Sequence, residues 1–485
     1  MKKNLIWFRN DLRLYDHTAL HEACKSDTDK VIALFIATPE EWKKHYISEK
    51  KISFMYYNLI SLEKDLLKLN IILHYHESTN FLKSIQYLMY FCFKHKINNL
   101  FYHYQYEFDE RNRDFLVKKK LSQQGVFVQG FHDNLLVSHE LIKNKNNKAY
   151  KVFSFFKKKI TQYLYKNKIP ECFSIPLKRK PDENYCFFNS VSSEKLDFKF
   201  DKKIFPVGEI EAFNRLKNFC IYKVNDYSLE RNFPFLNSTS MLSPYLSIGI
   251  ISSRHCLSMF LKTKINISLN NFFNSSWINQ ILWREFYYHL LISFPKLSKN
   301  QALVEWENRI DWNNNIKHFN AWKEGNTGFP IVDAGMRQLN ELGWMHNRVR
   351  MITSNFLVKN LFIDWRMGEK YFMSHLIDGD LALNNGGWQW SASIGTDSVP
   401  YIRILNPLNQ SKKFDISGVF IKKFIPELRN VPNEYIHQPH EWSKKMKCKI
   451  DYPDPIINYD DSRKRTLLIF KRVRSYFKKG LNTHE

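Results

Sequence analysis

Residues 378–390 combine the side chains that a large, redox-active ligand with polar edges would need. They read Asp378-Gly-Asp380-Leu-Ala-Leu-Asn384-Asn-Gly-Gly-Trp388-Gln-Trp390. Buried Asp and Asn need hydrogen-bond partners, and glycine lets another group approach the backbone closely. The indoles offer a stacking surface or a path for an electron. One interpretation is the wall of a ligand site. The other, equally supported by this segment alone, is a glycine turn between two helices with buried tryptophan.

Residues 277–287 suggest a second part of such a site. At helical spacing, Gln280, Trp283, Arg284 and Tyr287 share one face. An amide, an indole, a guanidinium and a phenol together suit stacking on a nucleobase and hydrogen bonding to it. The alternative, slightly favoured by this segment alone, is a helix that packs its tryptophans inward while Arg284 and Glu285 pair elsewhere.

Residues 344–351 form a third polar cluster. Asn347, Arg350 and Met351 fall together, whereas Arg348 points another way. Arg348 is a candidate phosphate contact, and the Arg350 guanidinium would stabilise a negative charge nearby. The competing interpretation is an ordinary basic surface helix.

Hydroxyl-bearing residues form a fourth, weaker signal. Tyr227 precedes the segment Thr239-Ser240-Met241-Leu242-Ser243. A hydroxyl-rich turn before a helix offers backbone and side-chain donors to a phosphate. Most such segments are plain helix caps.

The elements that must position these residues fall into two classes. Short β-rich runs at 5–9, 31–37, 71–76, 99–104 and 126–130 alternate with amphipathic stretches at 54–69, 81–95 and 110–123. This rhythm predicts an α/β domain over residues 1–135, with a doubly wound parallel sheet of Rossmann-like type. The dinucleotide fingerprint GxGxxG is absent after the first strand.

The remainder of the chain has few strand patterns. Residues 136–205 are rich in Lys and Asn, contain Pro170, Pro176 and Pro181, and are typical of a long connection, with one helix possible at 150–165. Helical patterns follow at 275–294, 331–342, 345–362 and 371–377, and a basic tail lies around 464–479. We therefore expect an all-α domain over residues 206–475.

The net charge of +25 and the pI near 9.5 indicate attraction to polyanions, nucleic acid first. AT-biased codons would also enrich Lys, so only residues at a site can decide. The seven cysteines form no CxxC pair, which is typical of a reduced protein without disulfides. No signal peptide or membrane span is evident, so a soluble, cytoplasmic protein is expected.

Taken together, the order and spacing of these motifs resemble the DNA photolyase/cryptochrome family, most closely its bacterial class I cyclobutane pyrimidine dimer photolyases. The resemblance runs from Trp7-Phe-Arg-Asn-Asp-Leu-Arg13 to Trp390. Residues 328–337, Gly-Phe-Pro-Ile-Val-Asp-Ala-Gly-Met-Arg, carry it most strongly together with 344–351 and 378–390.

The resemblance implies a helical domain that holds FAD in a folded conformation and repairs pyrimidine dimers with light. In the family, excited, reduced anionic FAD gives an electron to the dimer, which splits and returns it. Asn384 is expected beside the flavin N5, and Arg350 near the ring. The residues expected to hold FAD are Tyr227, Thr239, Ser240, Leu242, Ser243, Trp277, Arg284, Asn347, Arg350, Asp378, Asp380 and Asn384.

The same resemblance implies binding of ultraviolet-damaged DNA, with the poorly stacked dimer flipped out of the helix. Trp283 and Trp390 match the aromatic walls of the dimer pocket, and Met351 and Asn347 are expected against the dimer. Gln280 faces the thymine edges. Arg231, Arg348 and Arg403 are the expected phosphate contacts.

Two further functions follow from the family. Trp312, Trp365 and Trp388 match a tryptophan chain that carries an electron to photoexcited oxidised flavin, the alternative for each being a buried structural role. His45, Asp109, Glu110 and Lys299 match the site of a light-harvesting antenna, with methenyltetrahydrofolate the expected molecule.

Four positions depart from the family pattern. Asp109 stands where relatives often have Asn, and Ser298 where the bacterial pattern has Cys, which weakens the case for folate. Met241 replaces a common Arg. Gln280 replaces a common Glu, so it can hydrogen-bond to thymine but carries no charge; repair with altered efficiency is expected.

The alternatives belong to other functional classes. A cryptochrome-type blue-light sensor is the main one; Trp390, Met351 and Asn384 favour repair. A (6-4) photolyase would need a histidine pair, and only His346 lies close by in the matched motifs. A metal-dependent transferase at Asp378 and Asp380 lacks a ligand set. We expect a monomer that binds no metal and no membrane.

Overall fold

The computed structural model describes residues 2–26, 29–180, 191, 199–264, 267–396 and 402–481, with 476–481 described by backbone alone. The chain divides into two compact units. The first unit comprises Met1–Asn225, Ser240–Pro295 and Ile377–Asp380, and the second comprises Asp226–Thr239, Lys296–Leu376 and Leu381–Glu485.

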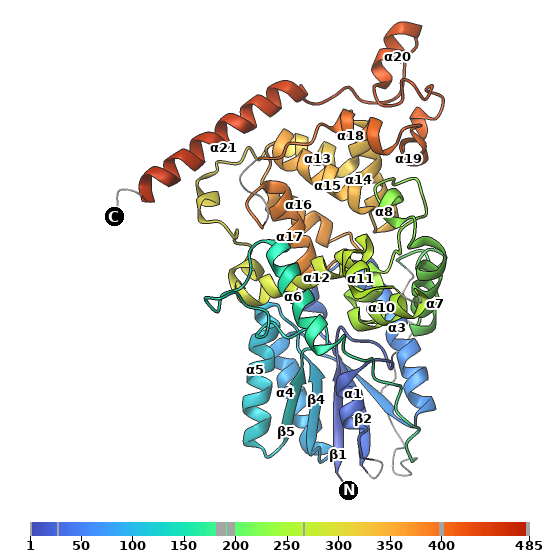
Figure 1. Cartoon of the computed structure of the whole chain (residues 1–485), viewed down its shortest axis with the longest axis vertical. Coiled ribbons are helices and arrows are strands. Elements are labelled where there is room, and N and C mark those ends of the chain that lie inside the picture. Colours follow the sequence, from blue (N-terminus) through green and yellow to red (C-terminus); the bar gives the residue numbers. More distant parts are fainter. Residues whose placement is uncertain are drawn as a thin grey trace. The chain divides into compact units, whose positions relative to one another are not determined.

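A five-stranded sheet lies in the first unit (Figure 1). Its order is β3-β2-β1-β4-β5, and all of its pairings are parallel. The sequence predicted each strand to within two residues at either end, and the doubly wound sheet is confirmed. The strands are β1 (Lys3–Phe8), β2 (Lys30–Ala37), β3 (Ile72–Glu77), β4 (Asn99–His103) and β5 (Phe127–Phe131).

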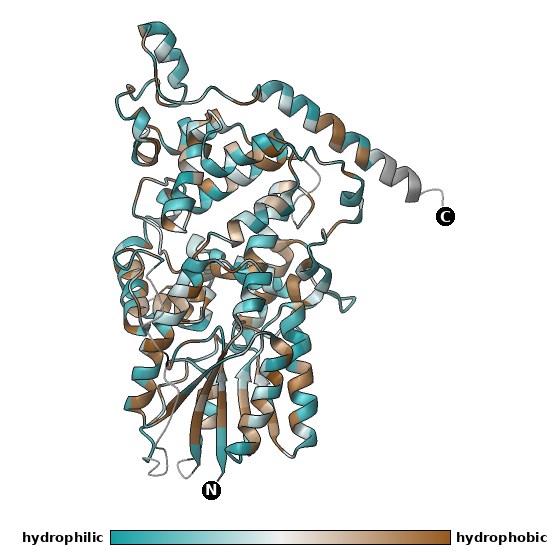
Figure 2. Ribbon diagram, turned by 180° about the vertical axis from the view of Figure 1, so that it is seen from behind, coloured by the Kyte–Doolittle hydropathy of each residue, from teal (hydrophilic) through white to brown (hydrophobic). Residues whose placement is uncertain are grey.

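Helices cover both faces of this sheet because its central strands β1 and β2 are buried along almost their whole length. Figure 2 shows apolar residues of the sheet in brown. On one face, Trp7, Leu34 and Tyr102 pack with Leu88 of α4 and Leu121 of α5. The helices between the strands are α1 (Thr18–Ala23), α2 (Pro39–Lys44), α3 (Glu49–Lys68), α4 (Phe81–Lys94) and α5 (Phe108–Gln123).

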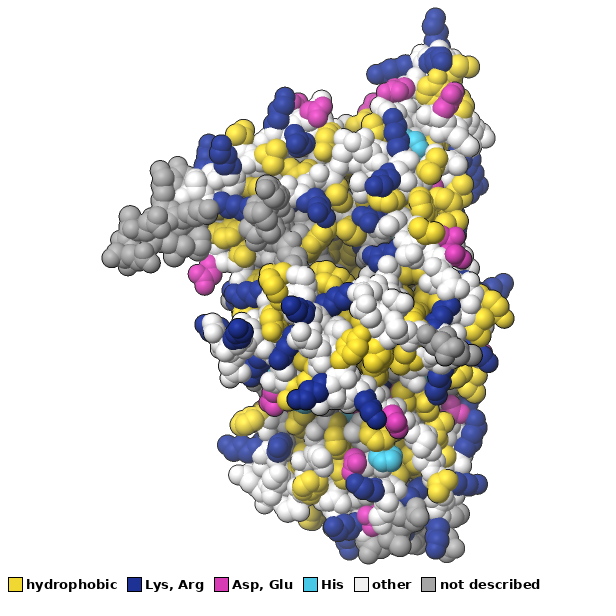
Figure 3. All heavy atoms as spheres, in the orientation of Figure 1, with side chains coloured by type: hydrophobic (Ala, Val, Ile, Leu, Met, Phe, Trp, Pro, Cys, Tyr) yellow, Lys and Arg dark blue, Asp and Glu magenta, His cyan; other side chains and the backbone are white. Residues whose placement is uncertain are grey.

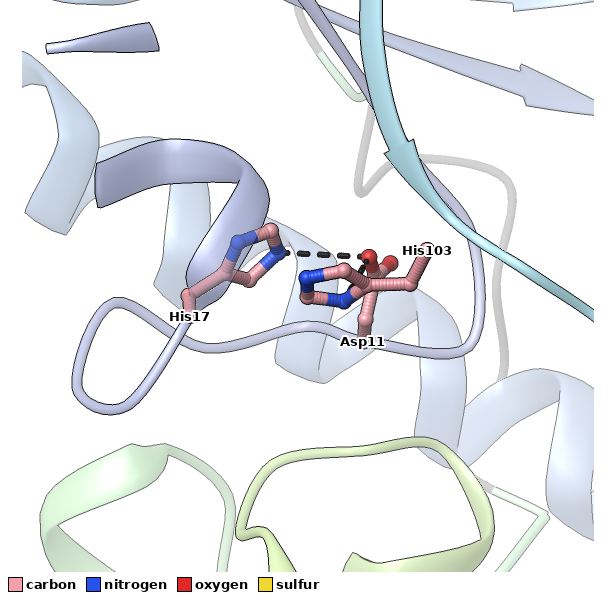
Figure 4. Close-up of side chains that lie close together, drawn as sticks. All are labelled: Asp11, His17 and His103. Atoms are coloured by element: carbon pink, nitrogen blue, oxygen red, sulfur yellow. Dashed lines mark ion pairs between the residues drawn. The ribbon is translucent and has the colours of Figure 1, made fainter. Parts of the chain in front are cut away.

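A buried polar cluster occupies the carboxyl ends of β1 and β4, where the strand order reverses and open α/β sheets commonly bind ligands. His17 Nε2 and His103 Nδ1 lie 3.2 and 2.9 Å from Asp11 Oδ2 (Figure 4). The other ring nitrogens accept the amide N–H groups of Leu20 and Ala19. In the neutral rings, the hydrogen is therefore on the nitrogen nearest Asp11, where a metal ion would need a lone pair. Burial lowers the pKa of His17 to about 4, so this ring is neutral at pH 7. The cluster is best described as a polar network within the core.

The first unit also contains helices that follow the sheet. The helix considered possible at 150–165 is present as α6, and the predicted helix at 275–294 is α12. Pro181 lies outside the described residues. These helices are α6 (Phe153–Asn167), α7 (Glu209–Asn218), the π-helical turn η1 (Phe219–Lys223), α9 (Ser243–Ser247), α10 (Ser253–Thr263), α11 (Leu269–Asn274) and α12 (Ser276–Ser293).

The described part of the second unit is helical, around a core that includes Trp322, Trp365 and Trp388. The predicted helix at 345–362 is divided into α15 and η4, and the one at 371–377 begins earlier, as α16. The basic tail is helix α21. The elements are α8 (Tyr227–Glu230), η2 (Pro295–Lys299), η3 (Glu305–Arg309), α13 (Ile316–Glu324), α14 (Pro330–Leu342), α15 (Asn347–Asn355), η4 (Phe356–Asn360), α16 (Trp365–Met373), α17 (Leu381–Ala392), α18 (Pro407–Phe414), α19 (Val419–Phe424), η5 (Pro426–Leu428), α20 (Pro439–Met446) and α21 (Tyr459–Leu481).

Lys and Arg side chains are scattered over the face drawn in Figure 3, with far fewer Asp and Glu among them. The excess charge is therefore distributed on this face, and does not by itself mark a binding site. Among the described helices, none combines the length and apolar character needed to cross a bilayer.

Candidate active site

Helix α17 contains most of the polar segment 378–390. Residues 378–380 precede it as a loop, whereas the glycine pair at 386–387 lies inside the helix. A Cβ atom placed on Gly387 would meet no atom within 4 Å. Asn384 lies one turn earlier, and its Nδ2 donates to the carbonyl of Glu369 at 3.0 Å. The helix thus borders open space next to a fixed amide, as a site for a planar ring requires.

A hydrogen-bond chain ties another side of α17 to Glu369. Asn385 Nδ2 donates to Glu369 Oε1 at 2.9 Å, and Gln389 Nε2 donates to Asn385 Oδ1 at 2.8 Å. Burial raises the pKa of Glu369 to about 7. Its Oε2 has no hydrogen-bond partner among the described residues. Glu369, whose backbone carbonyl accepts from Asn384, therefore gains its proton near neutral pH, unlike an ordinary carboxyl group.

Replacing Glu369 with glutamine should stabilise the protein increasingly as the pH rises. The pKa of Glu369 in the folded protein, about 7, lies above the ordinary 4.5. The contribution of Glu369 to the free energy of unfolding therefore decreases as the pH rises from about 4.5 to about 7 and the carboxyl group loses its proton. Glutamine stays neutral, so the gain should grow from near zero at acidic pH to roughly 3 kcal/mol at most above pH 7. Urea unfolding from pH 5 to 8 measures it. Glu324→Gln, at an exposed position, is the control, and a pH-independent difference would contradict the assignment.

The three tryptophans of the expected electron path all lie in the second unit. Trp388 is 2% exposed and Trp365 is fully buried, whereas Trp312 is partly exposed at the edge of the same core. The Trp388 ring lies directly on Gly368 of α16, where an added Cβ would come within 2.1 Å of it. Burial thus decreases from Trp388 and Trp365 to Trp312, as a path from the interior to the surface requires.

In the first unit, α12 supplies Trp277 and Arg284, and both are buried. Arg284 Nη1 donates to the carbonyl of Asn134 at 2.9 Å and to Ser253 Oγ at 3.2 Å. The Arg284 side chain is turned inward from the helix and also lies 3.8 Å from Glu285. Gln280, Trp283 and Tyr287 remain half-buried.

Two carboxylates of the first unit precede α17. Asp378 and Asp380 are 6% and 8% exposed. Tyr288 Oη donates to Asp380 Oδ2 at 2.5 Å, and Lys51 Nζ donates to the carbonyl of Gly379 between them at 2.5 Å. The loop 378–380 is therefore held by α3 and α12, and these contacts fix the position of its two carboxylates.

The hydroxyl-rich segment ends at a helix, as predicted, because α9 begins at Ser243. In the first unit, Met241 follows Ser240 and precedes Leu242 and Ser243 in the chain. Its backbone φ of 48° is rare for a residue with a side chain. Such a backbone outlier is often found at ligand sites. In the second unit, Thr239 is half-buried, and Arg231 lies 5.6 Å from the ring of buried Tyr227.

The aromatic residues expected at the dimer have defined neighbours. Trp283 stacks on Phe153 of α6, with ring centroids 3.8 Å apart and planes at 10°. Phe153 was missed by the sequence argument, although it begins the helix that the pattern at 150–165 indicated. Gln280 Nε2 donates to the carbonyl of Ser276 at 3.4 Å. These residues form one aromatic and amide surface on the first unit.

The remaining substrate candidates lie in the second unit. Asn347 is exposed and Met351 half-buried on α15, while Arg350 Nε donates to the carbonyl of Met345 at 2.7 Å. Arg403 lies 5.8 Å from the Trp390 ring. Arg348 donates to Asn232 Oδ1 at 2.7 Å, so a phosphate would share this guanidinium with Asn232.

Three of the four antenna candidates come together in the first unit. His45 Nε2 lies 3.5 Å from Asp109 Oδ2, and Lys44 Nζ lies 3.2 Å from the same oxygen. Glu110 Oε2 is buried without a hydrogen-bond partner among the described residues, and burial raises the pKa of Glu110 to about 7. Lys299 belongs to the second unit and is exposed.

A cavity of about 880 Å³ also lies in the first unit, lined mainly by residues of the segment 136–205 that the sequence indicated as a connection. Its walls carry cations and aromatic rings and no Asp or Glu, and Lys151 Nζ lies 5.2 Å from the Phe294 ring. Such a lining is typical of surfaces that bind single-stranded nucleic acid. The lining residues are His139, Lys143, Asn144, Asn147, Lys148, Ala149, Tyr150, Lys151, Val152, Phe155, Ile292, Ser293 and Phe294.

The residues expected at FAD are compatible with that group. Gly387 leaves space for a ring, Asn384 has a fixed amide with its carbonyl oxygen as a further acceptor, and Arg350 offers positive charge. Buried Asp378 and Asp380 supply acceptors for hydroxyl groups.

Comparisons with known proteins agree with these features. Residues 4–174 match the model described as DNA photolyase, and residues 277–472 match the FAD binding domain of DNA photolyase. The chain is 69% identical to the deoxyribodipyrimidine photo-lyase of Buchnera aphidicola subsp. Acyrthosiphon pisum, over 98% of both chains. It is 42% identical to the Escherichia coli protein of that name, over 98% of this chain and 99% of the relative.

Solved structures share the fold along the whole chain. A bacterial class III photolyase from Agrobacterium tumefaciens has a TM-score of 0.87 at 31% identity, over 98% of both chains. An archaeal photolyase from Sulfolobus tokodaii, with two FAD molecules, has a TM-score of 0.82 at 31% identity, over 97% of this chain and all of that one. From the sequence of motifs, the full-length likeness and the two matched domain models, the chain belongs to the DNA photolyase family.

Proposed function

We propose that this chain is a deoxyribodipyrimidine photo-lyase, which uses blue light to split cyclobutane pyrimidine dimers in DNA. The observation that carries the proposal is the 69% identity, over nearly the full length, to a relative of that name. Asn384, Met351 and Trp390 stand at the positions at which the family's repair enzymes differ from its sensors. The cryptochrome-type alternative has no support from these relatives.

FAD, when bound in its reduced anionic form, supplies the electron that splits the dimer. The chain positions the flavin through Tyr227, Thr239, Ser240, Leu242, Ser243, Trp277, Arg284, Asn347, Arg350, Asp378, Asp380 and Asn384. Arg350 favours the negative charge by its guanidinium, and Asn384 presents an amide whose orientation Glu369 fixes. Trp388, Trp365 and Trp312 conduct an electron inward from the surface when the flavin is oxidised.

The chain binds damaged DNA through aromatic and basic side chains. Trp283 and Trp390 stack against the extruded dimer, since its poor stacking lowers the cost of flipping. Gln280, Asn347 and Met351 contact its edges, while Arg231, Arg348 and Arg403 hold phosphates. The basic cavity of the first unit is an additional contact for a DNA strand.

An antenna chromophore occupies the site of His45, Asp109, Glu110 and Lys299 in this proposal. The Oε2 of Glu110, which accepts no hydrogen bond from the described residues, supports it, because a ring with N–H donors, such as a folate, would satisfy this atom. We also propose that the protein is a monomer in the cytoplasm. Its proposed domains are the α/β domain at 1–135, the connection at 136–205 and the all-α domain at 206–475.

Light-dependent repair tests the proposed function directly. The purified, reduced protein is mixed with ultraviolet-irradiated oligothymidylate, illuminated with blue light, and followed by the recovery of thymine absorbance. We expect recovery in the light and none in a dark control. No recovery from protein with a full complement of reduced FAD would favour the sensor.

Replacing Gln280 with glutamate should change the repair yield per absorbed photon, by about twofold to fivefold, the scale of one hydrogen bond of about 1 kcal/mol. Gln280 precedes Trp283 by about one turn of α12, and a carboxylate loses the donor to thymine while adding charge. Repair yield on the oligothymidylate measures the change, with Asn279→Asp on the same helix as control. An identical yield would remove Gln280 from the dimer site.

A further inference from the structure

Glu307 is a buried carboxylate that joins the two outer tryptophans of the expected electron path. It lies on η3 and is 2% exposed. Trp365 Nε1 and Trp312 Nε1 both donate to its Oε1, each at 3.2 Å. One oxygen atom therefore accepts from both indole N–H groups, one from Trp312 nearby in the chain and one from Trp365 at the start of α16.

Arg366 keeps this carboxylate charged. Its Nη1 donates to Glu307 Oε1 and its Nη2 to Oε2, both at 2.8 Å. Asp364 and the carbonyl of Asn300 hold the same guanidinium at 3.2 and 2.8 Å. Burial alone would raise the pKa of Glu307, but hydrogen bonds from Arg366 and from both indoles lower it overall. Glu307 is therefore ionised at neutral pH.

The position of the charge matters for electron transfer. An indole that gives up an electron becomes positively charged, and its N–H becomes a strong acid. A negative charge at hydrogen-bond distance stabilises this state and can accept the proton. Trp388, the innermost of the three, is not among the described residues that donate a hydrogen bond to Glu307.

We propose that Glu307 is a positioning residue for the electron path, which draws the positive charge outward to Trp365 and Trp312 and holds it there. When Trp388 gives an electron to photoexcited oxidised flavin, Trp365 replaces that electron and Trp312 replaces the one lost by Trp365. An added thiolate then gives one electron to Trp312 and becomes a thiyl radical. The Nε1 proton of oxidised Trp312 moves to Glu307 Oε1 and returns to Nε1 when the thiolate reduces the ring. This inference rests on the proposed electron path.

The proposed contact can be tested without light. In the holoprotein labelled with ¹⁵N at tryptophan, the Nε1–H signals of Trp312 and Trp365, assigned from Trp312→Phe and Trp365→Phe, should both shift as the pH falls and Glu307 is protonated. Glu307→Gln should remove this shared titration. Glu305→Gln, an exposed neighbour on η3, should retain it. Two signals that titrate alike in Glu307→Gln and Glu305→Gln would overturn the contact.

The effect on the path is measured by the rate at which blue light reduces oxidised FAD in the presence of thiol. Glu307→Gln should slow it about fivefold to tenfold, since it removes a charge-assisted hydrogen bond to each indole. Glu307→Asp should recover part of the rate, and Glu305→Gln all of it. An unchanged rate in Glu307→Gln would overturn the proposal, provided Trp388→Phe is slow. If Trp388→Phe is fast as well, the electron path itself fails.

Discussion

Trp388→Phe protein should lose almost all light-driven reduction of oxidised FAD, by about a hundredfold or more. The indole lies against Gly368 of α16 and is 2% exposed, so no solvent-borne donor can replace it easily. Phenylalanine fills most of the space but is much harder to oxidise than indole, so the path is interrupted at its innermost step. The measurement is the loss of flavin absorbance under blue light with thiol present.

Trp322→Phe is the matched control for this variant. Trp322 is equally buried in the same core, with its ring centroid 6.1 Å from that of Trp388, and its Nε1 donates to the carbonyl of Thr353 at 3.0 Å. It should cost stability yet leave photoreduction within about twofold, the change expected from altered packing alone. Equal losses in the two variants would mean that packing, and not electron transfer, explains the effect.

Asp333→Ala should be the most destabilising of the substitutions considered, by about 3–5 kcal/mol. The side chain is fully buried and accepts from Thr327 N at 2.8 Å, Thr327 Oγ1 at 2.6 Å and Gly328 N at 3.0 Å. Tyr452 Oη donates to its second oxygen. Alanine leaves all four donors buried without a partner, and this explains why Asp333 is central to the segment at 328–337.

The urea midpoint of the far-ultraviolet circular dichroism measures this loss. Asp311→Ala, at an exposed position before Trp312, should change the free energy of unfolding by less than about 0.5 kcal/mol. Tyr452→Phe removes one donor and should cost about 1 kcal/mol. A loss for Asp333→Ala no larger than that for Tyr452→Phe would show that the four hydrogen bonds do not act together.

The sequence determined the α/β domain because local patterns specify it. Each strand is a short β-rich run, and the side chains of the central strands β1 and β2 are buried almost throughout. Amphipathic stretches follow the second, third and fourth strands, so period and composition suffice. The motifs at 344–351 and 378–390 indicated the family only in combination with the other motifs, through their order and spacing along the chain. The sequence did not predict where a helix changes its winding. The helix predicted at 345–362 changes from α-helical to π-helical at η4.

Only the tertiary structure decided which side chains meet. The helical spacing that grouped Arg284 with Gln280 and Trp283 could not show that Asn134 and Ser253 bind it from distant segments. The stacking of Phe153 on Trp283 joins α6 to α12, and the hydrogen bond from Trp365 to Glu307 spans 58 residues of chain. Such contacts depend on how helices pack, since no local pattern encodes the distance between residues far apart in sequence.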